Sequence, residues 1–377
     1  MKIFSKIADY IRECDKIFLI LCLFTTCYGC MAVLSATYHA DGFGEFATQC
    51  VAMLLGLGVA IFISLFDFGA YIKFWPIAAA IGLVPVILTF FIGYAPPGTD
   101  DKAWLFIGGI SVQPAEFLKV MFLVTFSAHL QYVKENINKL RYLLPVCVHA
   151  AIPVVLVHFQ GDDGTAAVFA VMALGMMYAA GLRLRYFLIA FGAAVAASPF
   201  VYFFVMNDDQ RSRIINILSG QSDIQNAGYQ QYRGSVALAN GGFFGQGYLK
   251  GSLTQVGGVP EGHNDFIFVS IGEELGFLGC LAVILLLGAI AWRILMTGKK
   301  CSKKSGTFIC VGAFSMLLTH IIINIGMCLS LLPVIGITLP FFSAGGTSLL
   351  SIYMCMGLVM SVYMHRNSRT LYLRDDY

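Results

Sequence analysis

Residues whose side chains could do chemistry are concentrated in Pro260–Phe268, PEGHNDFIF, directly before a long apolar run. The ionisable members of this stretch are Glu261, His263 and Asp265. Desolvation at the mouth of an apolar segment raises the proton affinity of a carboxylate, and a neighbouring arginine lowers it. A carboxylate balanced in this way is suited to take a proton, so we predict that Asp265 is a general base. The alternative is that Asn264 or Asp265 only caps the helix that follows.

A second ionisable pair lies in Trp104–Lys119, WLFIGGISVQPAEFLK. Pro114 suits the first turn of a helix, and Glu116 then falls in that turn, where a carboxylate complements the helix dipole. Glu116 and Lys119 are spaced i, i+3 and share one helix face, which predicts a coupled ion pair. The alternative is that the pair only neutralises two charges so that the helix can insert, although ionisable residues inside membranes usually serve function.

Acidic and glycine-rich motifs occur in other polar segments. Asp162 and Asp163 belong to QGDDGT, immediately before an apolar run, and are expected to cap a helix and to be solvated. A metal site at this point would need further oxygen ligands. The segment 228–247, GYQQYRGSVALANGGFFGQG, has four glycines after Asn240. These glycines permit tight turns and a close approach of the backbone to a ligand such as a phosphate.

The elements that must position these residues are membrane-spanning helices. Of the 377 residues, 58% are hydrophobic and 12% are charged, whereas soluble domains contain roughly 25% charged residues. A bilayer core requires about 20 apolar residues per helix. We therefore predict an all-α polytopic membrane protein with one membrane domain over 1–377 and about ten transmembrane helices. The predicted spans are 17–36, 45–66, 70–93, 113–132, 142–159, 165–182, 185–206, 266–294, 307–331 and 346–364.

The distribution of lysine and arginine predicts that both termini lie inside. With this orientation the inside segments hold 18 of the 24 basic residues and the outside loops hold five, which follows the positive-inside tendency. The largest outside loop is then 207–264, between spans 7 and 8. It contains Arg211, Arg213 and Arg233 against that tendency. Because guanidinium groups suit phosphates and carboxylates, we predict an anionic ligand at the outer face.

The polar motifs together resemble those of the SEDS family (shape, elongation, division and sporulation), the RodA, FtsW and SpoVE type of bacterial peptidoglycan glycosyltransferase. The resemblance covers nearly the whole chain, including the ten-span topology with the N-terminus inside. It rests on six stretches of sequence: WLFIGGISVQPAEFLK, QGDDGT, DQRSRI, GYQQYRGSVALANGGFFGQG, VPEGHNDFIFVSIGEELG and PVIGITLPFFSAGGTS.

The resemblance implies a multi-pass enzyme of the bacterial cytoplasmic membrane that polymerises lipid II, the undecaprenyl-diphosphate-linked disaccharide–peptide, for elongation, division or sporulation. Asp265 corresponds to the family's essential carboxylate and would take the proton of the acceptor sugar's 4-hydroxyl. The residues expected to bind substrate are Trp104, Gln113, Glu116, Lys119, Arg213, Glu261, His263 and Ser343. No residue is assigned as a metal ligand, and the charge of the leaving diphosphate is expected to be met by outside arginines, with a divalent cation (Mg or Mn) left open.

The resemblance also implies the partners of the chain. They are lipid II, membrane lipid and a class B penicillin-binding transpeptidase, with no nucleic acid. Four positions depart from the family's usual residues: Ala103 replaces arginine, Ala115 replaces serine, Gly161 replaces proline and Asn264 replaces threonine. Since all four lie beside the ionisable positions, they are expected to affect substrate positioning more than catalysis.

Two other functions stay open at this point. A lipid II flippase or another transporter would use Glu116, Lys119, Glu273 and Glu274 to mark a passage. Such a protein needs polar groups through the depth of the bilayer, whereas these motifs cluster at one face, and the absence of an internal repeat also disfavours it weakly. The third function is a scaffold that only docks a transpeptidase, which would not require an interfacial Asp265.

Overall fold

A helix forms over each of the ten ranges that the apolar runs predict, and the all-α fold is confirmed. We describe the protein from a computed structural model, in which residues 10, 12–95, 101–219 and 228–367 are placed well enough to discuss. The ten helices are α2 (Lys16–Asp41), α3 (Gly44–Ser64), α5 (Trp75–Ile92), α6 (Pro114–Val133), α7 (Leu140–Phe159), α8 (Asp163–Ala179), α9 (Leu184–Phe200), α12 (Ile267–Lys300), α13 (Lys304–Cys328) and α14 (Gly346–Met364).

The described residues contain eight helices that are long and apolar enough to cross a membrane. The two remaining predicted spans are α6, which carries Glu116 and Lys119, and α8, which has only 17 residues. That α6 and α8 cross the membrane therefore stays a prediction. The count of ten crossings and the inside position of both termini stay predictions as well.

Shorter elements connect the long helices. They are α4 (Phe68–Lys73), β1 (Leu105–Ile107), β2 (Ile110–Val112), the π-helical turn η1 (Val201–Val205), α10 (Asp208–Ser219), α11 (Tyr229–Gly241) and the 3-10 turn η2 (Thr254–Val256). Residues 96–100, and residues 220–227 of the predicted outer loop 207–264, lie outside the described part.

Two of these short elements differ from the prediction. The predicted span 70–93 is divided into α4 and α5. The stretch before Gln113, expected to be irregular, forms an antiparallel hairpin of β1 and β2. Gly108 and Gly109 connect the strands with φ of 59° and 89°, and a two-residue hairpin turn with both φ values positive favours glycine.

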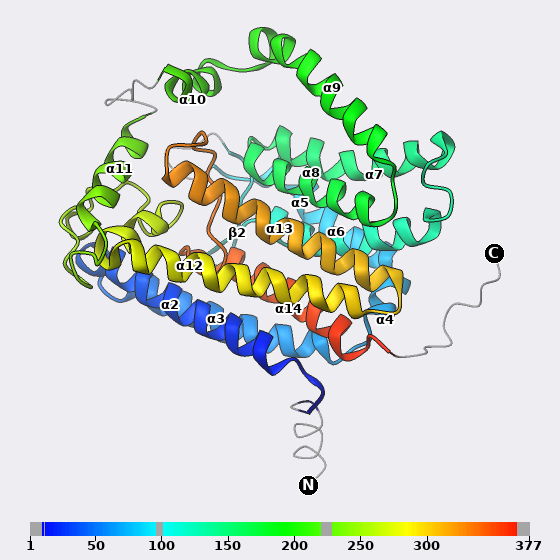
Figure 1. The fold of residues 1–377 in the computed structure, drawn as a ribbon, viewed down its shortest axis with the longest axis horizontal. Helices are drawn as coiled ribbons and strands as arrows, with labels where there is room; N and C mark the ends of the chain where they lie inside the picture. The colour runs from blue at the N-terminus through cyan, green and yellow to red at the C-terminus, as the bar shows by residue number, and fades with distance from the viewer. Residues whose placement is uncertain (1–9, 11, 96–100, 220–227, 368–377) are drawn as a thin grey trace.

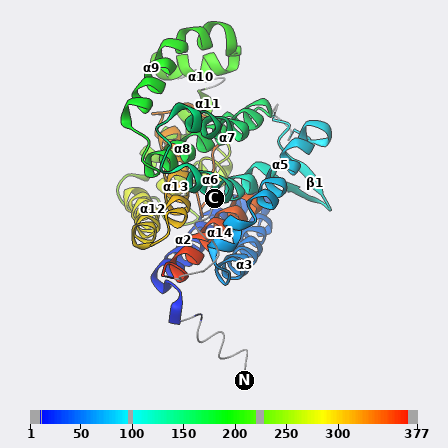
Figure 2. The ribbon, with the colours of Figure 1, turned by 90° about the vertical axis from the view of Figure 1, so that its right-hand side faces the viewer.

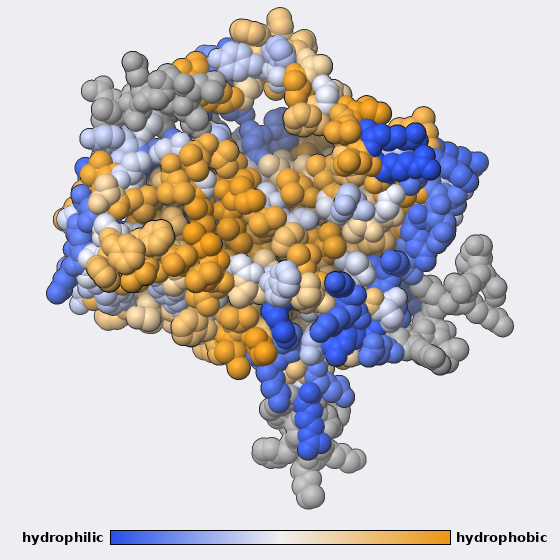
Figure 3. Space-filling view, in the orientation of Figure 1, coloured by the Kyte–Doolittle hydropathy of each residue, from blue (hydrophilic) through white to orange (hydrophobic). Residues whose placement is uncertain are grey.

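The two ends of the helix bundle differ in content. α11 and the start of α12 gather at one end, on the left of Figure 1, whereas the start of α2 and the end of α14 lie toward the other. In the rotated view α9 stands apart from the bundle, and none of its residues is buried (Figure 2). Hydrophobic side chains form a broad band across one face, with hydrophilic side chains gathered at both ends (Figure 3). This distribution is the one that a bilayer requires.

α14 lies inside the bundle, against α3, α6, α12 and α13. Small residues allow the close contact with α3. A Cβ at Gly357 would lie 2.7 Å from the Cα of Ala60, and a Cβ at Gly56 would lie 2.7 Å from the ring of Tyr353. Small residues at helix–helix contacts are typical of membrane proteins, because they let backbones approach. The contact fixes the first turns of α14, which supply serines to the site described below.

α12 is interrupted at Gly276, whose φ of 68° and ψ of −163° are not helical. Backbone from the loop after α11 enters the break, where the N–H of Gln246 donates to the carbonyl of Glu273 at 3.0 Å and that of Phe277 donates to Gly242 at 2.9 Å. A close approach of this glycine-rich loop is therefore seen to another backbone segment, and its approach to a ligand stays a prediction.

The buried carboxylates of Glu273 and Glu274 fasten an outer loop to α12. Glu273 accepts hydrogen bonds from the backbone N–H groups of Thr254 at 2.8 Å and Leu253 at 2.9 Å. Glu274 accepts from the hydroxyl of Ser35 on α2 at 2.5 Å and from the side-chain amide of Gln255 at 2.6 Å. This anchoring replaces the role in a transport passage that was considered for both residues.

We expect Gly245→Ala to destabilise the protein more than Gly242→Ala, its matched control. Both glycines have positive φ, 80° and 54°, but a Cβ at Gly245 would lie 2.1 Å from the carbonyl oxygen of Glu274, whereas a Cβ at Gly242 meets nothing within 4 Å. Backbone strain alone costs about 1–2 kcal/mol, and overpacking adds about 1–3 kcal/mol. Thermal unfolding in detergent measures the difference. Equal losses would show that the break in α12 does not need the close approach.

Candidate active site

The turn that carries Asp265 is fixed from outside by two other segments, α13 and residues 343–344. The side-chain amide of Asn324 on α13 donates to the backbone carbonyl of Asp265 at 2.8 Å. The hydroxyl of Ser343 donates to the carbonyl of Asn264 at 2.8 Å, and the N–H of Ala344 donates to the carbonyl of His263 at 2.9 Å. Ser343, predicted to bind substrate, is 6% exposed and is used here to hold the turn.

The carboxylate of Asp265 is not a helix cap. The N-cap of α12 is Phe266, and α12 has no side-chain capping hydrogen bond. The half-buried carboxylate of Asp265 accepts no hydrogen bond and pairs with no cation among the described residues. Burial, together with the negative charges of Glu261 and Asp162, raises the pKa of Asp265 to about 7. A carboxylate with a pKa near neutrality and no competing partner can exchange a proton with a ligand at physiological pH.

Asp162 caps α8 and approaches the same site. Its carboxylate accepts hydrogen bonds from the N–H of Thr165 and from the side-chain amide of Gln113, both at 2.8 Å. Burial raises the pKa of Asp162 to about 6, although the Thr165 hydrogen bond and the charge of Lys119 oppose this shift. The predicted capping role of Asp162 is therefore confirmed, and its charge is also felt at Asp265.

The segment 335–337 lies between Asp162 and Asp265. A Cβ at Gly164, two residues after Asp162, would lie 2.7 Å from the carbonyl oxygen of Ile335. A Cβ at Gly336 would lie 3.6 Å from Oδ2 of Asp265. The motif PVIGITLPFFSAGGTS therefore brings the start of α8 and the Asp265 turn together, although 103 positions separate the two aspartates in the sequence.

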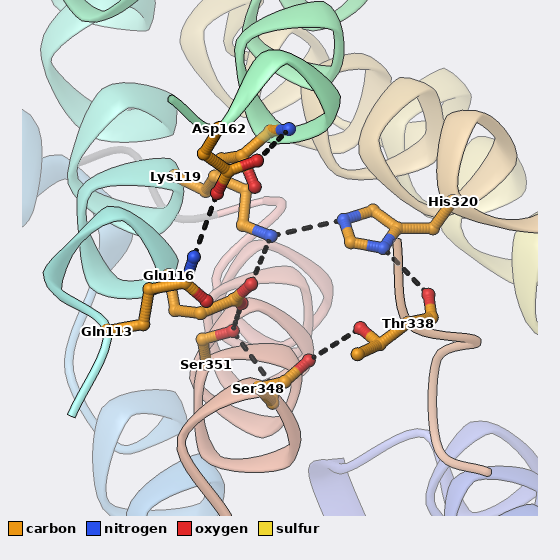
Figure 4. A network of polar contacts seen from close by, with 9 residues as sticks. Gln113, Glu116, Lys119, Asp162, His320, Thr338, Ser348 and Ser351 are labelled. Atoms are coloured by element: carbon orange, nitrogen blue, oxygen red, sulfur yellow. Dashed lines mark hydrogen bonds and ion pairs between the residues drawn. The ribbon is translucent and has the colours of Figure 1, made fainter. Parts of the chain in front are cut away.

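A closed ring of buried and partly buried polar contacts lies near Asp162 (Figure 4). Lys119 Nζ donates to Glu116 Oε1 at 2.8 Å, and the hydroxyl of Ser351 donates to Glu116 Oε2 at 2.6 Å. Ser351 also contacts the carbonyl of Ser348 at 2.9 Å, and the hydroxyls of Ser348 and Thr338 are 3.1 Å apart. The predicted Glu116–Lys119 pair is confirmed, with exposed fractions of only 4% and 1%.

His320 on α13 completes the ring. Its Nδ1 is 3.0 Å from the backbone carbonyl of Thr338, and its Nε2 is 3.1 Å from Lys119 Nζ. A carbonyl only accepts and an ammonium only donates, so His320 must carry its proton on Nδ1 and accept at Nε2. His320 is thus a neutral imidazole that links Lys119 to the segment beside Asp265.

The other residues predicted to bind substrate lie around this centre. Trp104 is half-buried at the base of the hairpin, where its carbonyl accepts from the N–H of Tyr94 at 3.0 Å. The exposed Arg213 on α10 donates to the carbonyl of Val334 at 2.8 Å, two residues from Gly336. Arg213 is therefore the predicted arginine that contacts the residue directly before segment 335–337, which borders Asp265.

Glu261 and His263 line a cleft of about 330 Å³ beside the turn. Glu261 is exposed, adopts φ of 53°, and accepts a hydrogen bond from the side-chain amide of Asn264 at 2.8 Å. Asp265 is not among the residues that line this cleft. The cleft thus adjoins the turn without including Asp265 in its lining.

The remaining outside arginines contact backbone rather than an open site. Arg211 donates to the carbonyls of Tyr202 and Phe203, each at 2.9 Å, and Arg233 donates to Gly258 at 2.7 Å. Asp163, expected to be solvated at the start of α8, is 41% exposed in the first turn of that helix. It also contacts His158 at 2.5 Å and accepts from Gln210 on α10 at 2.7 Å. It ties α10 to α8.

The four departures from the SEDS motifs have visible local consequences. Gly161 adopts φ of 93°, a conformation that proline cannot reach, so the turn before α8 is built differently here. Ala103 and Ala115 are fully buried and supply no polar group. Asn264 contacts Glu261 rather than Asp265. The departures thus alter the surroundings of the acidic groups and leave Asp162 and Asp265 in place.

His320, Asn324 and Ser351 were not identified from the sequence. His320 and Asn324 are polar residues within the apolar run of α13, a placement that itself suggests function. Ser351 had no comparable signal, because serine is common inside membrane helices. No group of three histidine, cysteine, aspartate or glutamate side chains in the described ranges is arranged to hold a metal ion.

Comparison with known proteins gives one consistent family. The family described as cell cycle protein, with the members FtsW, RodA and SpoVE, matches residues 15–368. The chain is 30% identical to the probable peptidoglycan glycosyltransferase FtsW of Geobacter metallireducens, covering 93% of this chain and 95% of that protein. It is 28% identical to the peptidoglycan glycosyltransferase MrdB of Escherichia coli K12 (93% and 94% covered) and 29% identical to the stage V sporulation protein E of Bacillus subtilis (92% and 96% covered).

Solved structures share the fold. One chain comes from a study of the structural coordination of polymerization and crosslinking by a peptidoglycan synthase complex. It superposes with a TM-score of 0.81 at 23% identity, covering 94% of this chain and 98% of that one. The rod shape determining protein RodA of Thermus thermophilus superposes with a TM-score of 0.71 at 22% identity, covering 94% and 98%. At these identities the likeness shows the fold alone.

Proposed function

The chain belongs to the FtsW, RodA and SpoVE family of cell cycle proteins, and from this premise we propose how it polymerises lipid II. It is a peptidoglycan glycosyltransferase and a multi-pass protein of the bacterial cytoplasmic membrane. The lipid tail of its substrate stays in the bilayer while the sugars lie outside. In this proposal the reacting bond is therefore held at the interface, and Asp265, in the turn before α12, supplies the base there.

Asp265 is the general base in this proposal. Its carboxylate takes the proton of the acceptor sugar's 4-hydroxyl while that oxygen attacks the anomeric carbon of the donor sugar. A glycosidic bond forms, and the bond from the anomeric carbon to the diphosphate breaks, so that undecaprenyl diphosphate leaves. General base catalysis contributes about 10²–10⁴-fold. Positioning and stabilisation of charge on the leaving group must supply the rest.

Arg213 is the residue we assign to the leaving diphosphate. It is exposed, and its contact with Val334 holds it near the segment that borders Asp265. Lys119 cannot serve in the same way, because it is 1% exposed and its ammonium already contacts Glu116 and His320. We propose that Glu116 and Lys119 shape the site from below, and that any divalent cation arrives with the diphosphate rather than at a prebuilt protein site.

The cleft at Glu261 and His263 supports a second substrate contact in this proposal. Because Asp265 does not line it, this cleft suits a part of the substrate that does not react. Trp104 and Gln113 border the site through the hairpin and through Asp162. The partner that we propose is a class B penicillin-binding transpeptidase, which would crosslink the strands.

The observation that carries the proposal is an unpartnered carboxylate, with a pKa raised to about 7, at the outer mouth of a membrane helix. Purified protein in detergent, supplied with lipid II and scored for glycan polymer, tests it. We expect the wild-type protein to form glycan polymer in an assay that contains no transpeptidase. Absence of polymer under conditions in which the protein is folded and binds lipid II would reject the proposal.

The pH dependence of polymerisation is a further expected result. The ionised form of Asp265 is the active base, and burial raises its pKa to about 7. The rate should therefore fall about tenfold for each pH unit below 7 and should level off above it. Steady-state rates between pH 5 and 9, with folding checked at each pH, measure this profile. A rate that stays constant down to pH 5 would contradict a base with this pKa.

A further inference from the structure

One face of α13 carries three polar side chains, each of which contacts one or both of two backbone segments. His320, Asn324 and Cys328 are spaced by four residues, and this spacing places them on one face of the helix. The first segment is the turn at Asp265, and the second is 335–343. All three side chains are buried. Because membrane helices bury polar groups only at a cost, a stripe of this kind requires an explanation.

Asn324 joins the two segments directly. Its Nδ2 donates to the carbonyl of Asp265 at 2.8 Å and to the carbonyl of Ile337 at 2.7 Å. An amide NH₂ has two protons, and both are used here. Cys328 adds a weaker contact from its sulfur to the same Asp265 carbonyl at 3.5 Å. The backbone at Asp265 is therefore fixed to α13 and, through Asn324, to the neighbouring segment.

His320 fixes the other side of segment 335–343. Its Nδ1–H donates to the carbonyl of Thr338, one residue after the carbonyl that Asn324 holds. Its Nε2 accepts from Lys119 (Figure 4). The stripe on α13 thus connects the Glu116–Lys119 pair to the segment that borders the carboxylate of Asp265.

We propose that Asn324 and His320 are positioning residues for the general base, which fix Asp265 relative to segment 335–343 and to the ion pair on α6. The proposal rests on the polymerase function above and extends it to residues that touch no reacting atom. The internal hydrogen bonds of the turn, such as that from Phe266 N–H to the Glu261 carbonyl, keep its shape but do not fix its place in the molecule. A misplacement of 1 Å at a reacting group costs about 10²-fold in rate.

Asn324→Leu tests the first half of the proposal. Leucine has a similar size but donates no hydrogen bond, so the turn loses the Asn324 hydrogen bond to α13 and keeps the weaker contact from Cys328. We expect kcat to fall about 10- to 100-fold with KM nearly unchanged, because the geometry of the base matters most in the transition state. The pH midpoint of kcat should also move, since the surroundings of the Asp265 carboxylate change. A merely structural role would reduce the folded yield and leave kcat per folded molecule and the midpoint as in the wild type.

A pair of substitutions at His320 tests the positioning role of His320, the second half of the proposal. This test can be made even if Asn324→Leu does not fold. The amide nitrogen of asparagine takes the place of Nδ1, so His320→Asn keeps a donor for the Thr338 carbonyl. His320→Leu keeps none. We expect the asparagine variant to retain kcat within about threefold and the leucine variant to lose about tenfold. Equal kcat in the two variants would overturn this half.

Thr319→Val is the matched control on the same helix. Its buried hydroxyl donates only to the carbonyl of Ser315 within α13, at 2.7 Å, so its loss should leave kcat and the pH midpoint unchanged. Wild-type kcat in folded Asn324→Leu would reject the inference and leave the polymerase function standing. Failure of the wild-type protein to polymerise lipid II would reject the function, and the inference with it.

Discussion

Asp265→Asn is expected to lower the rate of lipid II polymerisation by at least about 10²-fold, the lower end of what general base catalysis contributes. Asparagine keeps the size of the side chain but cannot take a proton. Because the N-cap of α12 is Phe266 and no side chain caps that helix, the substitution removes no structural hydrogen bond of the described chain. Folded yield and thermal stability should therefore stay close to those of the wild type.

Binding separates loss of the base from loss of the site. Lipid II should still bind to Asp265→Asn, because the base is needed in the transition state more than in the ground state. Glu135→Gln is a suitable control, since its side chain is 82% exposed in the α6–α7 connection, remote in sequence from all the motifs above. It should polymerise at the wild-type rate. Near-normal polymerisation by Asp265→Asn would remove Asp265 from the mechanism.

The buried pair on α6 has the largest expected effect on stability. Lys119→Met leaves the carboxylate of Glu116 buried without its cation, and Glu116→Gln leaves the ammonium of Lys119 without its anion. Breaking a buried pair by removing one partner costs about 3–5 kcal/mol. The double variant removes both charges while glutamine still offers an acceptor to Ser351. It should lose less free energy of unfolding than the two single losses added together.

Denaturation in mixed micelles measures the four proteins of this double-mutant cycle. Asp208→Asn is the matched control, because Asp208 and Arg211 have the same i, i+3 spacing but their side chains are 99% and 32% exposed. Exposed pairs contribute little, so this substitution should leave stability almost unchanged. Losses that simply add in the double variant would mean that Glu116 and Lys119 are not coupled, despite their contact at 2.8 Å.

The Glu116–Lys119 pair was predictable from the sequence because its geometry is local. A spacing of three residues on a helix fixes which face both side chains share, whatever the rest of the chain does. The same is true of the capping role of Asp162 and of the ten helical ranges, since the length of an apolar run limits what it can form. The type and place of Asp265, at the mouth of such a run, likewise singled it out as the proposed base, and that role stays a prediction.

Other contacts could not be predicted, because the partner is distant in the sequence. Glu273 and Glu274 were considered only for the alternative of a transport passage, and loop 253–255 and Ser35 of α2 supply their hydrogen bonds. The glycines after Asn240 were expected to permit a close approach of the backbone, and the break at Gly276 receives part of this backbone. In each case the residue type showed that a polar or close contact was needed, and only the packing of helices showed which group supplies it.

The sequence by itself determined the membrane class, the helical ranges, the family and the identity of the proposed base. The tertiary structure alone decided what surrounds that base. Asn324 reaches Asp265 across 59 positions, and Ser351 reaches Glu116 across 235. Hydrogen bonds act only within about 3 Å, so a contact between distant positions exists only once the helices have packed. For that reason the residues that can do chemistry were readable in the sequence, whereas the residues that hold them in place were not.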